Sequence, residues 1–204
     1  MEEGLIVRTG KANQARYIPQ PKKGRALRKP LRVHRILLNR GLAEDAVLRQ
    51  INEEGAIFES MADNVSSIVH YAFTEMLNNA IEHSRSEKID VVMMKTAADI
   101  RFSVTDRGIG ILYNIMKTKR LGAVMEAIQD LLKGKETTAP DAHSGEGIFF
   151  TSKIADRLAI RSFEKKIVFD NIRKDVYIKD VQPIKGTRVD FILNLKSPKK
   201  LTDL

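Results

Sequence analysis

The longest regular hydrophobic pattern in the chain lies between residues 63 and 83. Apolar residues recur there at spacings of three and four, which places them on one face of a helix. These residues are Val65, Ile68, Val69, Ala72, Met76, Ala80 and Ile81. The pattern predicts a long amphipathic helix, with Asp63 or Asn64 as its N-terminal cap.

Weaker helical patterns occur on both sides of this helix. Apolar residues from Leu31 to Ile51 predict connecting helices over residues 30–54, with Glu44 and Asp45 in an early helical turn after Gly41. Further helices are predicted downstream, over residues 111–117, 121–132 and 148–158, with a loop over 133–145.

Strand patterns fill most of the remaining chain. Ile100, Phe102 and Val104 alternate with polar residues and so share one face of a strand. Strands are predicted over residues 88–95, 99–105, 159–163, 166–169, 175–179 and 187–195. The fold class expected is α+β: a two-layer sandwich with helices on one face of a mixed, mostly antiparallel sheet.

The N-terminal region differs in composition from the rest. Two short strands are predicted at residues 5–8 and 15–18, and residues 19–30 hold three of the six prolines, as a linker does. Residues 1–40 hold 11 Lys and Arg against 2 acids, so 35 − 11 = 24 basic and 26 − 2 = 24 acidic residues remain for 41–204. The net charge of +9 therefore lies in the first fifth of the chain. Such asymmetry suits either a polyanion-binding arm or a solvated basic linker.

Composition excludes several classes of protein. The chain has no cysteine, so it contains neither disulfides nor thiolate metal sites. No apolar run approaches the roughly 20 residues of a membrane span, and the start lacks the apolar core of a secretion signal. A cytoplasmic protein without a membrane partner is expected.

The stretch FTEMLNNAIEHS, residues 73–84, carries the first candidate chemistry. Glu75 and Asn79 are four residues apart and so lie on one helix face. An amide oxygen can ligate Mg²⁺, and a carboxylate can polarise a water molecule. Surface helices often carry the same pair, so by itself it does not decide between a site and a solvated face.

Three glycine motifs follow in the sequence. VTDRGIGI ends a strand at Asp106, and its glycines, Gly108 and Gly110, permit a tight turn close to a ligand. HSGEGIFF places Gly145 and Gly147 before a helix, where free N–H groups form a phosphate seat. KGTRVDFIL enters a strand through the pair Gly186-Thr187.

The ordered set ExxxN, DxGxG, GxG and GT resembles the ATP-binding fold shared by DNA gyrase, sensor histidine kinases and MutL, the Bergerat fold. The resemblance covers about residues 55–195 and implies ATP and Mg²⁺ as cofactors. It implies that Glu75 is the general base or water-orienting acid and Asn79 the Mg²⁺ ligand. It implies that Asp106 accepts the adenine amine, and that Thr187 supports Asp106 and a water beside the adenine.

The glycines and the lid take further roles from the same resemblance. Gly108 and Gly110 correspond to residues that shape the purine pocket, and Gly145 and Gly147 to the loop that contacts the triphosphate. Residues 111–144 then correspond to an ATP lid, from which phosphate-contacting residues are expected at Lys133, Lys135 and His143. Each of these three also fits a solvated lid charge.

Two relatives within this fold fit the chain. His34 is the only upstream candidate for a phospho-acceptor histidine, and it lacks the polar neighbour usual for one, which disfavours a sensor kinase. The pattern looks most like bacterial proteins that join a DNA-binding winged helix to this ATPase domain, with anti-sigma serine kinases as the compact alternative. The N-terminal strands are then similar to the wing, and the chain is expected to be a fragment of a longer protein.

The domain expectation follows from this resemblance. It is a basic hairpin and linker over residues 1–29, connecting helices over 30–54, the ATP-binding domain over 55–197 and a linker over 198–204. The expected function is an ATP/Mg²⁺-binding regulatory domain with slow or no hydrolysis. The alternatives are a serine/threonine protein kinase and a DNA-binding module with a degenerate ATPase fold. Partners to consider are DNA through the basic arm, a regulatory protein, and a second copy of the chain in a homodimer.

Overall fold

Helices pack on a five-stranded sheet in the computed structural model, which describes residues 6–9, 16–19, 30–134 and 146–203. The strand order is β3-β4-β5-β7-β6, and every pairing within the sheet is antiparallel. The strands are β3 (Leu31–Leu38), β4 (Lys88–Lys95), β5 (Asp99–Asp106), β6 (Arg157–Asp170) and β7 (Asp175–Asn194). The α+β sandwich is therefore confirmed, whereas the expectation of a mixed sheet is wrong.

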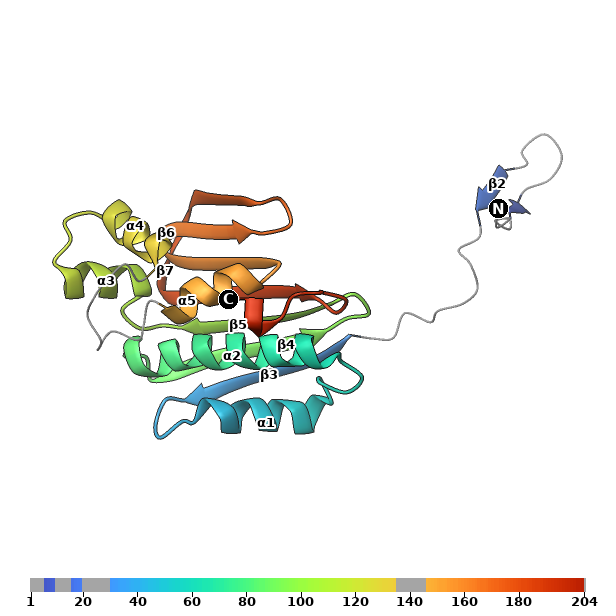
Figure 1. Ribbon diagram of the computed structural model, residues 1–204, viewed down its shortest axis with the longest axis horizontal. Coiled ribbons are helices and arrows are strands. Elements are labelled where there is room, and N and C mark those ends of the chain that lie inside the picture. The colour runs from blue at the N-terminus through green and yellow to red at the C-terminus, as the bar shows by residue number, and fades with distance from the viewer. Residues whose placement is uncertain (1–5, 10–15, 20–29, 135–145, 204) are drawn as a thin grey trace.

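The helices reproduce most of the predicted pattern. In Figure 1, α2 and α5 lie in front of the sheet, α1 lies beside the edge strand β3, and α3 and α4 lie together beyond one end of the sheet. Their bounds are α1 (Glu44–Gly55), α2 (Asp63–His83), α3 (Ile111–Lys119), α4 (Val124–Lys133) and α5 (Glu146–Ile154). None of the helices in the described ranges has the length and apolar character needed to cross a membrane.

Residues 31–38 form the edge strand β3, so the prediction of a helix there is wrong. All eight residues of β3 pair with β4, from Leu31 opposite Lys95 to Leu38 opposite Lys88. The side chains alternate as a strand requires: Val33 is buried beneath the helices, whereas Ile36 is exposed. Pairing along a sheet edge thus overrides the weak helical spacing.

The long helix α2 begins at Asp63 without a side-chain cap, contrary to the sequence expectation. Asn64 instead donates its side-chain amide to the backbone oxygens of Ser197 and Lys199, at 2.9 Å each. This residue therefore holds the C-terminal segment against the start of α2 rather than capping the helix.

The sequence predicts four short strands over residues 159–195, whereas the structure has two long strands there, because β6 and β7 continue through bends. Phe163 has a left-handed φ of 55° at an irregularity in the β6–β7 register. The N–H of Asn171 donates to the oxygen of Asp156 at 3.0 Å, so the far end of β6 returns beside its beginning. The helix predicted to reach residue 158 is correspondingly shorter, since β6 begins at Arg157.

Stacked aromatic side chains tie α2 to the centre of the sheet. Phe73 of α2 meets Phe102 of β5 edge-on at 5.4 Å between ring centroids, and Phe102 stacks on Phe191 of β7 at 4.6 Å. All three are buried. Such pairs add about 0.5–1.5 kcal/mol each beyond their buried area. The three elements that carry candidate site residues are therefore fixed to one another.

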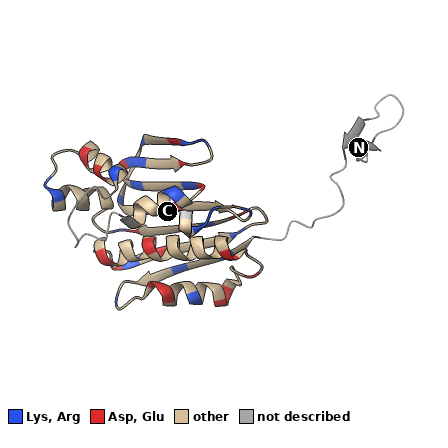
Figure 2. Ribbon diagram, in the orientation of Figure 1, with Lys and Arg blue, Asp and Glu red and all other residues tan. Residues whose placement is uncertain are grey.

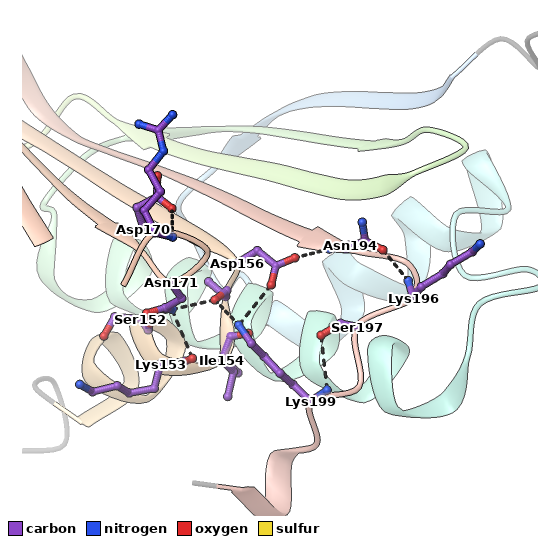
Figure 3. A network of polar contacts seen from close by, with 12 residues as sticks. Ser152, Lys153, Ile154, Asp156, Asp170, Asn171, Asn194, Lys196, Ser197 and Lys199 are labelled. Atoms are coloured by element: carbon purple, nitrogen blue, oxygen red, sulfur yellow. Dashed lines mark hydrogen bonds and ion pairs between the residues drawn. The ribbon is translucent and has the colours of Figure 1, made fainter. Parts of the chain in front are cut away.

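The C-terminal end of α5 is held by the network shown in Figure 3. Lys199 donates to the oxygens of Ile154 and Ala155 and pairs with Asp156 at 3.2 Å. Asn171 donates to the oxygens of Ser152 and Ala155. Terminal helix carbonyls need such partners, and a cation is favourable at this end of a helix. The described part of the chain ends in the short 3-10 helix η2 (Leu201–Asp203).

The N-terminal strands β1 (Ile6–Thr9) and β2 (Arg16–Pro19) pair antiparallel, as the sequence predicted. Over the rest of the described chain both signs of charge occur on helices and strands alike, as Figure 2 shows. This mixture agrees with the equal numbers of acidic and basic residues beyond residue 40.

Candidate functional site

A cavity of about 170 Å³ lies among α2, α3, α4, β5 and β7. Much of its wall is apolar, formed by Met76, Val104, Ile111, Ile115, Leu131 and Ile148. Nine of the 18 lining residues are polar, among them Asn79, Asp106 and Thr187. Apolar surface for an organic ring, with polar side chains that orient it, is typical of a small-molecule site.

Asp106 presents a buried carboxylate to this cavity. It ends β5, is only 4% exposed, and accepts the N–H of Gly108 at 2.8 Å through Oδ1. Burial raises the pKa of this carboxyl above its ordinary value, while hydrogen bonds from Gly108 and Thr187 act in the opposite direction. The loop therefore holds this carboxylate in place at the wall of the cavity.

Thr187 joins three parts of the site. Its Oγ1 accepts the N–H of Ile111 at 2.8 Å, at the first residue of α3. Its backbone and side chain also hydrogen-bond to Asp106. Thr187 therefore fixes the start of α3 relative to the buried carboxylate.

Gly186 is required by the same arrangement, a role that sequence reasoning missed. It has a φ of 82°, and a Cβ on it would lie 2.2 Å from the backbone oxygen and 2.6 Å from Oδ1 of Asp106. Any side chain here would displace the carboxylate. The Gly-Thr pair before a strand was a visible signal, but only the fold reveals that β7 brings it beside Asp106.

Gly108 and Gly110 do not line the cavity, but they allow the loop after Asp106 to pack closely against its neighbours. A Cβ on Gly108 would lie 1.7 Å from the backbone oxygen of Ser84. The same oxygen accepts a hydrogen bond from the N–H of Ile109 at 2.8 Å. Gly110 has a φ of 80°. The DxGxG loop is therefore packed directly onto the end of α2, and Asp106 and Asn79 line one cavity.

Glu75 and Asn79 share one face of α2, as predicted. The side-chain amide of Asn79 donates to the backbone oxygen of Glu75 at 2.8 Å, which leaves the amide oxygen of Asn79 for a ligand in the cavity. Burial is the main cause that raises the pKa of Glu75, followed by the nearby carboxylates of Glu44 and Glu82.

Gly147 lies against Glu75 at the start of α5. A Cβ at this position would be 2.0 Å from Oε2 of Glu75. The structure therefore brings Gly147, the second glycine of the GxG motif, to Glu75 of the ExxxN motif. Three other predicted site residues, Lys135, His143 and Gly145, lie outside the residues that the structure describes.

Two lid residues that sequence reasoning passed over also line the cavity. Lys119, the last residue of α3, donates to Oδ1 of Asp130 on α4 at 2.5 Å. The predicted helix ended at residue 117 and so stopped before Lys119. Following the face of Ile111 and Ile115 by one more turn would have found it.

The donor set suits Mg²⁺ bound together with a phosphate ligand. The described parts of the chain hold no group of three or more His, Cys, Asp or Glu that could bind a metal. Mg²⁺ commonly uses only one or two protein oxygens and completes its octahedron with phosphates and water. The single amide oxygen of Asn79 fits that pattern.

The family of the histidine kinase-like ATPase domain matches residues 40–169, which is more than half of the chain. The matched segment contains Glu75, Asn79 and Asp106 and ends before Thr187. A comparison with curated proteins finds no match. The chain therefore belongs to the histidine kinase-like ATPase domain family.

Proposed function

We propose that this domain binds ATP with Mg²⁺ in the cavity between α2 and the lid helices. The observation that supports the proposal most strongly is the buried carboxylate of Asp106 in an apolar cavity that also contains Asn79. The apolar walls receive the adenine, and Asp106 accepts a hydrogen bond from its exocyclic amine. Asn79 contributes its amide oxygen to Mg²⁺, which the bound phosphates also ligate.

Discrimination between nucleotides tests this proposal. Adenine presents an amine where guanine presents an oxygen. The carboxylate of Asp106 accepts from the amine and repels the oxygen, so ATP should bind more tightly than GTP. Calorimetry with the whole chain, in Mg²⁺, is expected to give at least a tenfold preference for ATP, at about 1.4 kcal/mol per tenfold. Equal affinity for ATP and GTP would contradict the assignment of Asp106.

The proposal extends to a regulatory role with slow or no hydrolysis. Glu75 takes the role of orienting or deprotonating a water beside the terminal phosphate, supported by its contact with Gly147 at the start of α5. The nucleotide state is then read by the segments attached to this domain. Incubation with labelled ATP separates this proposal from a serine/threonine kinase, which transfers label to a protein partner instead of releasing phosphate.

A second role is proposed for the N-terminal arm, on the strength of its charge alone. Residues 1–29 hold eight Lys and Arg against two acids, and this excess of positive charge suits the phosphate backbone of DNA. Contacts of this kind position a protein without reading sequence. The arm is accordingly proposed to bind duplex DNA electrostatically and with little sequence preference.

A further inference from the structure

The ion pair between Lys119 and Asp130 joins the two lid helices at the wall of the cavity. Lys119 is at the end of α3 and Asp130 is within α4, and the two side chains are 44% and 31% exposed. Both line the cavity that contains Asp106. Among the described residues that line this cavity, Lys119 is the only Lys or Arg.

The geometry of α3 separates Lys119 from the carboxylate of Asp106. The helix begins at Ile111, whose N–H is fixed to Thr187 beside Asp106. At 1.5 Å per residue, the Cα of Lys119 lies roughly 12 Å further along the helix axis. A base that contacts Asp106 covers the start of α3, and the sugar and phosphates attached to it extend beyond the base. Lys119 is then the one Lys or Arg that the described cavity wall offers to those phosphates.

We propose that Lys119 is a phosphate-binding residue of this site and that Asp130 is its internal competitor. This inference rests on the proposed binding of a nucleotide. A phosphate group takes the ammonium of Lys119 from the carboxylate of Asp130, and the ion pair between α3 and α4 is broken. Because a polyphosphate carries more negative charge than one carboxylate, it is the stronger partner for the same ammonium.

The consequence is a lid whose helices respond to the charge of the ligand. Breaking a partly exposed ion pair costs little, so the exchange is not opposed by the fold. Leu131, the neighbour of Asp130, packs on the cavity wall. Release of Asp130 therefore changes how α4 packs over the bound ligand. Nucleotides with more phosphates should release it more completely.

Two variants separate the roles of the pair. Lys119→Met keeps the apolar stem and removes the charge, and should weaken ATP binding by about tenfold. Asp130→Asn keeps the shape and removes the competing charge, and should tighten ATP binding by about two- to fivefold. Adenosine lacks phosphates, so its affinity should change less than about twofold in either variant.

A second ion pair supplies matched controls. Lys165 and Asp180 also meet at 2.5 Å, on the β6–β7 hairpin and not at this cavity. Lys165→Met and Asp180→Asn change the net charge by the same amounts. They should leave the affinities for ATP and adenosine as in the wild type.

Calorimetry with ATP, ADP and adenosine on all five proteins gives a clear outcome, with circular dichroism to confirm folding. Opposite shifts for Lys119→Met and Asp130→Asn, growing from ADP to ATP and absent for adenosine, support the exchange. If the wild type binds ATP but Asp130→Asn binds it no more tightly, the competitor role is wrong while ATP binding stands. If Lys119→Met weakens ATP and adenosine equally, Lys119 only supports the fold. If the wild type binds no nucleotide, both proposals fall.

Discussion

Gly147 of α5 leaves no room for a side chain beside the carboxylate of Glu75 on α2. A Cβ at position 147 would lie 2.0 Å from Oε2 and 3.0 Å from Cδ of Glu75. Two motifs more than sixty residues apart thus meet at one contact. The start of α5, the expected phosphate seat, and the expected water-orienting acid are therefore fixed relative to each other.

Gly147→Ala should accordingly disturb Glu75 more than it disturbs the fold. Overpacking of this kind costs about 1–3 kcal/mol of folding free energy, and the displaced carboxylate should lower any ATP turnover at least tenfold, since small misplacements of a catalytic group are costly. Denaturant unfolding and phosphate release measure the two effects. Gly122→Ala is the matched control, because the nearest atom to a Cβ there is 4.0 Å away. Equal turnover in the two variants would contradict the account of this contact.

Binding and chemistry should separate between Glu75 and Asn79. Asn79→Ala removes the proposed metal ligand and should weaken ATP binding in Mg²⁺ more than in its absence. Glu75→Gln should leave binding within about threefold but abolish turnover, because it removes a proton acceptor. Calorimetry with and without Mg²⁺ and phosphate-release assays test both. Undiminished turnover in Glu75→Gln would leave Glu75 as an ordinary helix residue.

The pH dependence of any turnover should also report Glu75. Its pKa is raised above the ordinary 4.5 by burial, then by Glu44 and Glu82. The base must be ionised to act, so the acid limb of the turnover profile should lie above 4.5. Glu82→Gln removes one of the two carboxylates and should move that limb to lower pH. A limb that stays in place would exclude Glu75 as its source.

Asp106 should make folding stability depend on pH in a defined direction. Its pKa in the folded chain is raised above the ordinary 3.8, mainly by burial. The folded state therefore binds more protons than the unfolded state between 3.8 and the raised value, and stability falls as pH rises through that window. Compared with Asp106→Asn, the wild type should gain unfolding free energy as pH falls through the window and change no further below it. A difference that is flat across the window would contradict the raised pKa.

The basic arm should bind DNA in a salt-dependent way. Each phosphate that it neutralises adds about 0.9 to the slope of log affinity against log salt. Deletion of residues 1–29 should abolish binding to duplex DNA and leave ATP affinity unchanged. Fluorescence anisotropy at several salt concentrations measures this. A shortened chain that still binds DNA at physiological salt would place the DNA-binding surface elsewhere.

Sequence alone predicted the elements whose periodicity is undisturbed. The helix α2 carries a clean apolar stripe, and β5 alternates clearly, so both were found with correct type and nearly correct bounds. The edge strand β3 was mistaken for a helix because only its pairing with β4 defines it. The bend at Phe163 was invisible because a left-handed conformation at a bulky residue has no sequence signal.

In the candidate site, too, local motifs could be predicted from the sequence and long-range contacts could not. Glu75, Asn79 and Asp106 lie in recognisable motifs, and the fold brings Asn79, Asp106 and Thr187 to one cavity. The need for glycine at position 186 and the pairing of Lys119 with Asp130 depend on elements distant in sequence. Contacts of this kind are set by tertiary packing, and local spacing does not encode them.

A matched pair of variants tests most directly whether Asp106 holds the adenine of ATP. Asp170 is also a buried aspartate at the end of a strand, and its Oδ1 accepts the N–H of Arg173 at 3.1 Å. Asp106→Ala should weaken ATP binding by about ten- to a hundredfold, corresponding to about 1.5–3 kcal/mol for a lost charge-assisted hydrogen bond. Asp170→Ala, which leaves the cavity intact, should bind ATP as the wild type does. In calorimetry with Mg²⁺, unchanged ATP affinity in Asp106→Ala, or an equal loss in both variants, would contradict the account.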